Sequence, residues 1–147
     1  MAIRKFAAAI ALGIGCLASA GPSFATDSEM CLARNIYHEA RGESRVDQIA
    51  VAHVVLNRTE HPRFPSTVCG VIHQRGQFSW TSRNHGPPRE RAAWERALTI
   101  SRQVLSGEVS DPTNGAVYFW NHRQVRPSWT RNLIPTLSTA RHTYGKR

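Results

Sequence analysis

Residues 26–58 read TDSEMCLARNIYHEARGESRVDQIAVAHVVLNR and carry the signals of two successive helices. Thr26 followed by Glu29 is typical of a capping box at a helix start. Apolar residues then recur at helical spacing as far as Ala40. Gly42 is the kind of residue that stands just past a helix end. The first part of the stretch therefore predicts an amphipathic helix.

A second helix is predicted directly after the first. Ser44 is a candidate N-cap, and residues 49–56 are apolar almost all round. A helix without a polar face is usually buried, so we expect this one to be central. His53 is its strongly polar interruption. We expect a buried, hydrogen-bonded histidine there, with a ligand role as the alternative.

The rest of the chain predicts a mainly helical α+β fold with a small β element. The tail from Pro127 has no clear period. The expected elements are a short helix capped by Ser66, a β-compatible segment at 77–80, a helix with an apolar stripe from Trp94 to Leu105 ended by Gly107, and a strand over 116–120.

The first residues predict targeting. Arg4 and Lys5 precede an apolar run over residues 6–20, and small residues up to Ala25 offer cleavage sites. This order is typical of a secretory signal peptide over residues 1–25, followed by a single domain over 26–147. An uncleaved anchor is the alternative. After cleavage we expect no membrane span, and a periplasmic or secreted protein.

Two cysteines, Cys31 and Cys69, remain after such cleavage. In an oxidising compartment an isolated pair is most simply a disulfide. It would close a loop of roughly 40 residues and stabilise the fold by about 3–4 kcal/mol. Two buried free thiols are the alternative.

The chain is basic, with 19 Lys and Arg against 10 Asp and Glu in 147 residues. Removal of residues 1–25, which hold two of these cations and no acid, lowers the formal net charge from +9 to +7. A secreted basic protein is expected to meet an anionic polymer, such as cell-wall glycan with acidic peptide stems, rather than nucleic acid. The alternative is that the charge serves solubility alone.

The segment that carries chemistry is 37–43, YHEARGE. Glu39 falls in the last turn of an apolar helix, where the negative end of the helix dipole and desolvation both raise a carboxyl pKa. A raised pKa suits a general acid that works near neutral pH. The alternative is a structural pair between Glu39 and Arg41.

Other chemistries lack their motifs. A zincin would need a second histidine four residues after His38, where Gly42 stands, and no G-x-S-x-G occurs. A disulfide would leave neither cysteine as a nucleophile. We therefore expect no metal and no cofactor.

Five ordered blocks resemble the SleB family of cell-wall hydrolases. They are LARNIYHEARGE at 32–43, QIAVAHVVLNR at 48–58, FPSTVC at 64–69, QFSW at 77–80 and DPTNGAVYF at 111–119.

This resemblance implies a small lysozyme-like domain that cleaves peptidoglycan between N-acetylmuramic acid and N-acetylglucosamine, in some members by lytic transglycosylation. The family's catalytic glutamate stands first in the E-A-R-G-E block, which is Glu39 here. His142 and Tyr144 also fit the family's ending, whereas Thr139 and Ala140 replace its usual Ile-Gly.

In the expected mechanism Glu39 protonates the glycosidic oxygen, and its anion then takes a proton from the attacking hydroxyl. If the attacker is the sugar's own C6 hydroxyl, no second carboxylate is needed. If it is water, a second acid would help, and Glu43 is the candidate. We favour the transglycosylase; a water-using muramidase or glucosaminidase, or a non-catalytic wall-binding protein, is the alternative.

A β element facing the catalytic helix would border the glycan groove. We expect Trp80 to stack on a sugar ring, and polar side chains nearby to bond its substituents. The alternative places Phe78 and Trp80 in the core. The candidate substrate-binding residues are Gln77, Ser79, Trp80, Tyr118 and Asn121. We expect the protein to act as a monomer.

Overall fold

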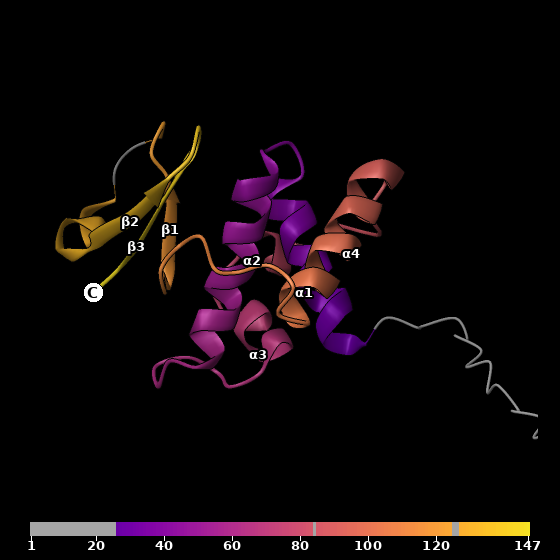
Figure 1. Cartoon of the computed structure of the whole chain (residues 1–147), viewed down its shortest axis with the longest axis horizontal. Coiled ribbons are helices and arrows are strands. Elements are labelled where there is room, and N and C mark those ends of the chain that lie inside the picture. The colour runs from indigo at the N-terminus through magenta and orange to yellow at the C-terminus, as the bar shows by residue number, and fades with distance from the viewer. Residues whose placement is uncertain (1–25, 84, 125–126) are drawn as a thin grey trace, which may run out of the picture.

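The computed structural model describes residues 26–83, 85–124 and 127–147 (Figure 1). The expected signal peptide, residues 1–25, lies outside the described residues. Three longer helices, α1 (Asp27–Ala40), α2 (Arg45–Thr59) and α4 (Arg91–Leu105), form a helical layer with the short α3 (Val68–His73). A small sheet packs beside α2. The predicted α+β class is confirmed.

The predicted starts of α1 and α2 are also confirmed. The Thr26 hydroxyl accepts a hydrogen bond from the Glu29 amide at 3.2 Å, and the Ser44 hydroxyl accepts one from the Asp47 amide at 3.2 Å. The prediction for α3 was wrong by one residue, since Thr67 caps it by accepting from the Gly70 amide at 3.1 Å. Each cap satisfies a backbone amide that the helix itself leaves without a partner.

The sheet has three antiparallel strands in the order β1-β3-β2. They are β1 (Tyr118–Asn121), β2 (Ile134–Ser138) and β3 (His142–Lys146). The segment 77–80, expected to be β-compatible, forms no strand and instead runs into a 3₁₀ turn, Ser79–Ser82; a second 3₁₀ turn, Ser128–Asn132, precedes β2. The predicted strand over 116–120 is shifted by one to two residues. The β element therefore comes mainly from the tail, whose sequence has no clear period.

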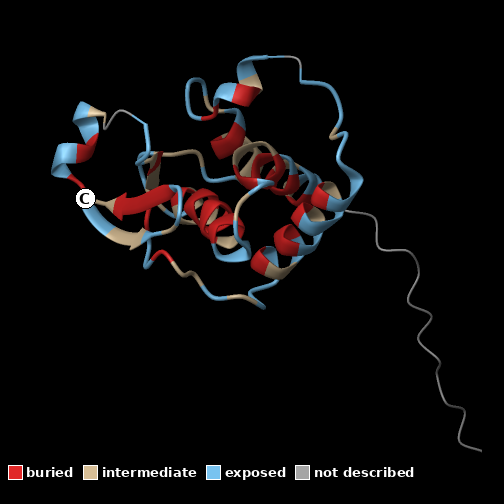
Figure 2. Cartoon of the chain, turned by 90° about the horizontal axis from the view of Figure 1, so that it is seen from above, coloured by how far each residue is buried: buried red, intermediate tan, exposed pale blue. Residues whose placement is uncertain are grey.

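The core has two parts, and Figure 2 colours the buried residues red. The larger lies among the four α-helices, and the smaller lies between α2 and the sheet, where Val51 and Val54 pack with Ala116 and Tyr144. Both sides of α2 are thus covered, as its all-round apolar sequence predicts. His53 is buried and its Nε2 lies 3.1 Å from the carbonyl oxygen of Val109, which confirms the hydrogen-bonded histidine.

The predicted disulfide is confirmed. Cys31 in α1 is bonded to Cys69 in α3, with 5.4 Å between their Cα atoms and a sequence separation of 38. It holds the short α3 against α1. A six-residue helix is too short to be stable by itself, so this covalent tie fixes its position.

Replacing both cysteines, Cys31→Ala with Cys69→Ala, should lower the free energy of unfolding by about 3–4 kcal/mol, because the unfolded chain regains the entropy of the open loop. Urea unfolding of oxidised protein measures this. Wild type in reductant serves as the control and should unfold at the same urea concentration as the variant. Equal midpoints for variant and oxidised wild type would contradict the prediction.

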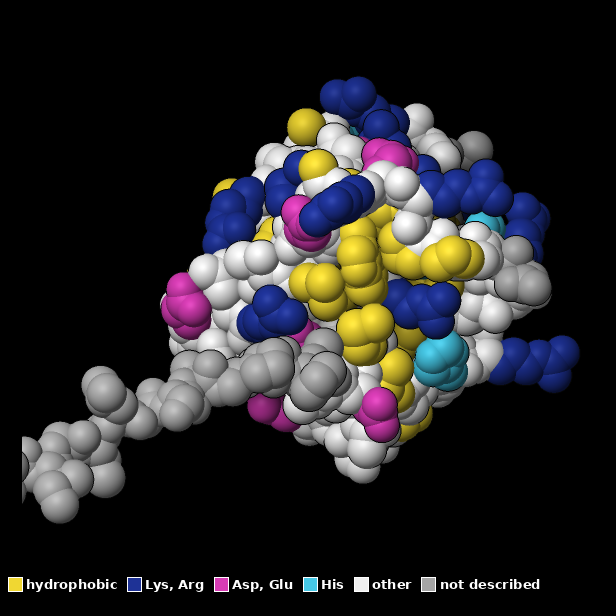
Figure 3. Space-filling view, turned by 90° about the vertical axis from the view of Figure 1, so that its right-hand side faces the viewer, with side chains coloured by type: hydrophobic (Ala, Val, Ile, Leu, Met, Phe, Trp, Pro, Cys, Tyr) yellow, Lys and Arg dark blue, Asp and Glu magenta, His cyan; other side chains and the backbone are white. Residues whose placement is uncertain are grey.

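Basic side chains are spread over the face seen in Figure 3, around a central group of hydrophobic side chains. The excess of cations in the composition is therefore exposed at the surface. Among the residues that the structure describes, no helix combines the length and the apolar character needed to cross a membrane.

Candidate active site

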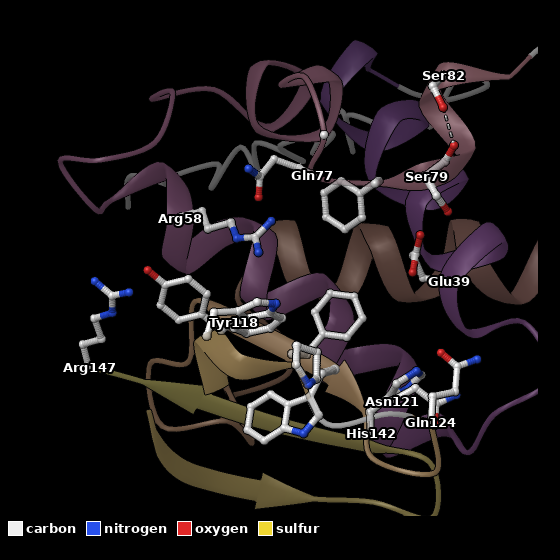
Figure 4. Close-up of a pocket in the computed structure, with 16 residues that line it drawn as sticks. Glu39, Arg58, Gln77, Ser79, Ser82, Tyr118, Asn121, Gln124, His142 and Arg147 are labelled. Atoms are coloured by element: carbon white, nitrogen blue, oxygen red, sulfur yellow. Dashed lines mark hydrogen bonds between the residues drawn. The ribbon is translucent and has the colours of Figure 1, made fainter. Parts of the chain in front are cut away.

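A pocket of about 870 Å³ opens where the end of α1, the turn before Ser79–Ser82, the end of α2 and the sheet meet (Figure 4). Four of the predicted site residues line it together with Glu39. The lining residues are Glu39, Arg58, Gly76, Gln77, Phe78, Ser79, Ser82, Tyr118, Phe119, Trp120, Asn121, Gln124, Pro127, Trp129, His142 and Arg147.

Glu39 lies in the last turn of α1 and its carboxylate faces the pocket beside Ser79 (Figure 4). Burial raises the pKa of this carboxyl from its ordinary value; His142, in its protonated form, and Arg58 oppose the shift without cancelling it. No residue within the described parts of the chain donates a hydrogen bond to it. The geometry thus favours a carboxyl that keeps its proton to higher pH than an exposed one.

Arg41 is turned away from Glu39. Its Nε donates to the Glu90 carboxylate at 2.7 Å, which ties the end of α1 to the start of α4. The structural pair considered for Glu39 is therefore absent, and the carboxyl is left to the pocket.

The predicted polar residues border the pocket from two directions. Gln77 and Ser79 belong to the loop and 3₁₀ turn after α3, and Tyr118 and Asn121 stand at the two ends of β1. The Tyr118 hydroxyl accepts a hydrogen bond from Arg63 Nη2 at 3.1 Å, which fixes its position. The backbone thus brings amide, hydroxyl and ring groups from separate segments to the walls of one pocket.

Trp80 corrects one expectation. Its side chain is not in this pocket: the residue is only 9% exposed, Nε1 donates to Asn35 Oδ1 at 3.0 Å, and the ring stacks on His38 at 4.6 Å. Trp80 borders a smaller hollow of about 350 Å³ that also touches Glu39. This burial favours the alternative in which Trp80 belongs to the core, and contact between its ring and a sugar stays a prediction.

Glu43, the candidate second acid, also lies outside the pocket. Its carboxylate pairs with Arg141 Nε at 2.9 Å. The turn after Ala40 carries Glu43 past the helix end and away from Glu39. Of the carboxylates in the described chain, Glu39 is therefore the one that lines the pocket.

Several pocket residues were not predicted. Arg58 is buried, donates from Nε to the Val117 carbonyl at 2.8 Å and lies over Phe64 and Phe78. Burial lowers the pKa of Arg58 to about 10. An arginine that ends an otherwise apolar helix is a signal that could have pointed to it.

Two tryptophans, Trp120 and Trp129, also line the pocket. Trp129 is 46% exposed, whereas Trp120 is largely buried, and their rings meet edge-on with 6.1 Å between centroids. Trp129 also lies 6.1 Å from the ring of Tyr118. Trp129 therefore has the exposed aromatic face that we expected of Trp80.

A buried polar cluster lies behind the pocket wall. Asp47 of α2 bonds to His142 Nδ1 at 3.0 Å and accepts a hydrogen bond from the hydroxyl of Tyr144. Burial alone would raise the pKa of Asp47, but these hydrogen bonds outweigh it and hold the pKa below its ordinary value. His142 and Tyr144, both from β3, thus join the sheet to the helical layer.

Among the described side chains, no group of three or more His, Cys, Asp or Glu is placed to hold a metal ion.

Comparison with known protein families shows the class to which this fold and pocket belong. Residues 42–145 match the family model described as cell wall hydrolase, so the chain belongs to the cell-wall hydrolase family. The matched range begins just after Glu39 and includes the other pocket residues up to His142.

Within that family the chain is similar to SleB proteins, as its sequence blocks suggested. It matches the catalytic domain of the germination-specific lytic transglycosylase SleB from Bacillus anthracis with a TM-score of 0.71 and 27% identity, over 86% of this chain and 99% of that one. The catalytic domain of the Bacillus cereus SleB protein matches with a TM-score of 0.65 and 29% identity, over 85% and 94%.

Curated relatives include the spore cortex-lytic enzyme of Halalkalibacterium halodurans, 37% identical over 111 residues, or 74% of this chain and 32% of the relative. That of Bacillus cereus is 34% identical over 118 residues, 78% and 42%. The chain thus spans about a third to two fifths of the length of these relatives.

Proposed function

We propose that this protein cleaves the glycan strands of peptidoglycan between N-acetylmuramic acid and N-acetylglucosamine, as a lytic transglycosylase with Glu39 as its general acid. The observation that carries the proposal is Glu39 itself. It is a half-buried carboxyl with a raised pKa and the one carboxylate, among the described residues, that lines the pocket.

Protonated Glu39 gives its proton to the glycosidic oxygen as the bond to C1 breaks, through a transition state with oxocarbenium character. The sugar's C6 hydroxyl then attacks C1 and closes a 1,6-anhydro ring. The attacking oxygen loses its proton in that step, and the Glu39 carboxylate is one group able to receive it. Because the nucleophile belongs to the substrate, the reaction needs no second carboxylate, which agrees with Glu43 lying outside the pocket.

The pocket walls suit a glycan. The amides of Gln77, Asn121 and Gln124 can bond N-acetyl and hydroxyl groups, and the ring of Trp129 can cover the apolar face of a sugar. Arg58 and Arg147 add positive charge to the wall, and the whole chain carries an excess of cations. Long-range attraction to a wall polymer with acidic peptides follows from this excess. Such a substrate places the protein in the periplasm or outside the cell, and we expect it to act there as a monomer.

Mass spectrometry of peptidoglycan digested by the protein tests this proposal. We expect new ends that carry 1,6-anhydro-muramic acid. Reducing-end muramic acid or glucosamine would instead show a hydrolase that uses water, and the absence of new ends would favour a wall-binding protein without catalysis.

Trp129→Ala should raise KM about five- to tenfold with little change in kcat, because loss of one stacking contact of about 1–1.4 kcal/mol weakens binding by that factor. Initial rates on soluble glycan fragments measure this. Met30, exposed in α1 and away from the pocket, provides a matched control as Met30→Ala. An unchanged KM in the tryptophan variant would remove Trp129 from the binding wall.

A further inference from the structure

We propose that His142, held by Asp47, is a second catalytic group of this site: the base that receives the proton of the attacking hydroxyl while Glu39 serves as the acid. The inference rests on the proposed function, because it assigns one proton transfer of that reaction. It differs from the mechanism in which Glu39 serves both oxygens in turn.

The first support is the orientation of the ring. Asp47 is 1% exposed and His142 is 5% exposed, with Nδ1 and Oδ2 3.0 Å apart. The lowered pKa of Asp47 keeps it a carboxylate, which only accepts hydrogen bonds, so Nδ1 carries the proton. In neutral imidazole the other nitrogen, Nε2, is then the basic one. A carboxylate that orients a histidine base in this way recurs on unrelated enzyme folds.

The second support is where Nε2 lies. His142 lines the same pocket as Glu39, and Figure 4 draws both residues at this end of it. Nε2 of His142 has no hydrogen-bond partner within residues 26–83, 85–124 and 127–147. This atom is also not fully buried. It is therefore open to the pocket, where a substrate hydroxyl could reach it.

The third support is the cost of the arrangement. Burying a carboxylate and an imidazole costs desolvation energy. Apolar side chains of similar size at the same positions often give a fold that is equally stable or more stable. The surrounding core is apolar, with Ala50, Val51 and Val54 on α2. A polar pair whose free nitrogen faces a pocket fits a chemical role better than a purely structural one.

The proton count closes with two groups. Glu39 loses its proton to the leaving oxygen as the C1–oxygen bond breaks, and His142 Nε2 gains the proton of the C6 hydroxyl as the new O6–C1 bond forms. The proton on His142 then returns to Glu39, directly or through water. The sum is cleavage of the strand with no net uptake or release of protons.

Four variants test the assignment. His142→Asn places an amide donor near the position of Nδ1, so the bond to Asp47 persists while Nε2 is lost. Asp47→Asn donates to Nδ1, which moves the ring proton to Nε2 and blocks the base. His142→Ala leaves space for imidazole from solution. His53→Gln is the matched control. His53 in α2 is buried like His142, but it bonds the Val109 backbone and does not line the pocket.

We expect His142→Asn to stay folded by thermal unfolding and to lose at least about 10²-fold in turnover, the usual range for an acid–base group. Asp47→Asn should lose turnover comparably, and the double variant should lose no more than His142→Asn alone, because the pair acts as one unit. Added imidazole should restore part of the turnover of His142→Ala and none in Glu39→Gln. His53→Gln should keep wild-type turnover per folded molecule.

Near-normal turnover in folded His142→Asn, or a His142→Ala variant that imidazole does not restore, would overturn the assignment. Both results leave the proposed function intact, provided that wild type releases anhydro ends and Glu39→Gln does not. If wild type itself releases no new glycan ends, it is the proposed function that fails.

Discussion

Glu39→Gln should reduce the turnover of peptidoglycan by about 10²–10⁴-fold, the range that general acid catalysis contributes. The amide keeps the shape of the side chain but has no proton to transfer to the glycosidic oxygen. Glycan binding should persist, because Gln77, Tyr118 and Trp129 are untouched. Release of soluble fragments from purified cell walls measures turnover, and co-sedimentation with the same walls measures binding. A near-normal Glu39→Gln enzyme would reject the mechanism.

The same variant should be at least as stable as wild type at neutral pH. Burial raises the pKa of Glu39 above its ordinary value of 4.5, so the folded state binds this proton more tightly than the unfolded state. Above the ordinary pKa, ionised Glu39 therefore weakens the fold, and the uncharged amide removes that cost. Below pH 4.5 the carboxyl is protonated in both states and the difference should vanish. Urea unfolding at neutral and at acid pH checks the sign.

Glu43→Gln is the matched control. It removes a carboxylate four residues away that pairs with the half-exposed Arg141 outside the pocket. We expect turnover close to wild type and a stability loss of about 0.5–1.5 kcal/mol, because the Glu43 side chain is only 14% exposed and its contact with Arg141 is partly shielded from water. Comparable activity losses at Glu39 and Glu43, with no anhydro product, would favour hydrolysis by two carboxylates.

The helices were accessible from sequence because their signals are local. A hydroxyl cap at Thr26 or Ser44 and a run of apolar residues act within one or two turns. Glu39 could be placed for the same reason, since its helix end and its apolar neighbours stand beside it in the chain. The family resemblance implied a lysozyme-like groove, and on that basis Gln77 and Ser79 were predicted to lie in the same site as Glu39.

The sheet and the second half of the site depend on contacts that are distant in sequence. Strand β1 pairs with β3, so Trp120 lies opposite Thr143, and a strand's preference depends on such partners. Asp47 and His142 are 95 residues apart and meet only because β3 packs on α2. Residues 77–80 look like a strand by composition, yet no strand of the described residues pairs with them and they enter a 3₁₀ turn.

The sequence predicts that Trp80 stacks on a sugar, whereas the structure places it in the core. Replacing Trp80 distinguishes these two roles. The indole is buried in the main core, its Nε1 bonds Asn35, and its ring covers His38. Trp80→Ala should lower the free energy of unfolding by about 3–5 kcal/mol, as large-to-small changes in cores do.

Activity should follow a different course from stability in Trp80→Ala. Under conditions where the variant is folded, turnover per folded molecule should stay within about threefold of wild type, a difference of under 1 kcal/mol. Trp80→Phe is the milder control: it keeps most of the ring and loses the bond to Asn35, for about 1–3 kcal/mol, since the buried amide loses its partner. Urea unfolding and initial rates on the same samples separate the two effects. A stable Trp80→Ala protein that no longer binds glycan would contradict this expectation and favour a contact between the ring and the sugar.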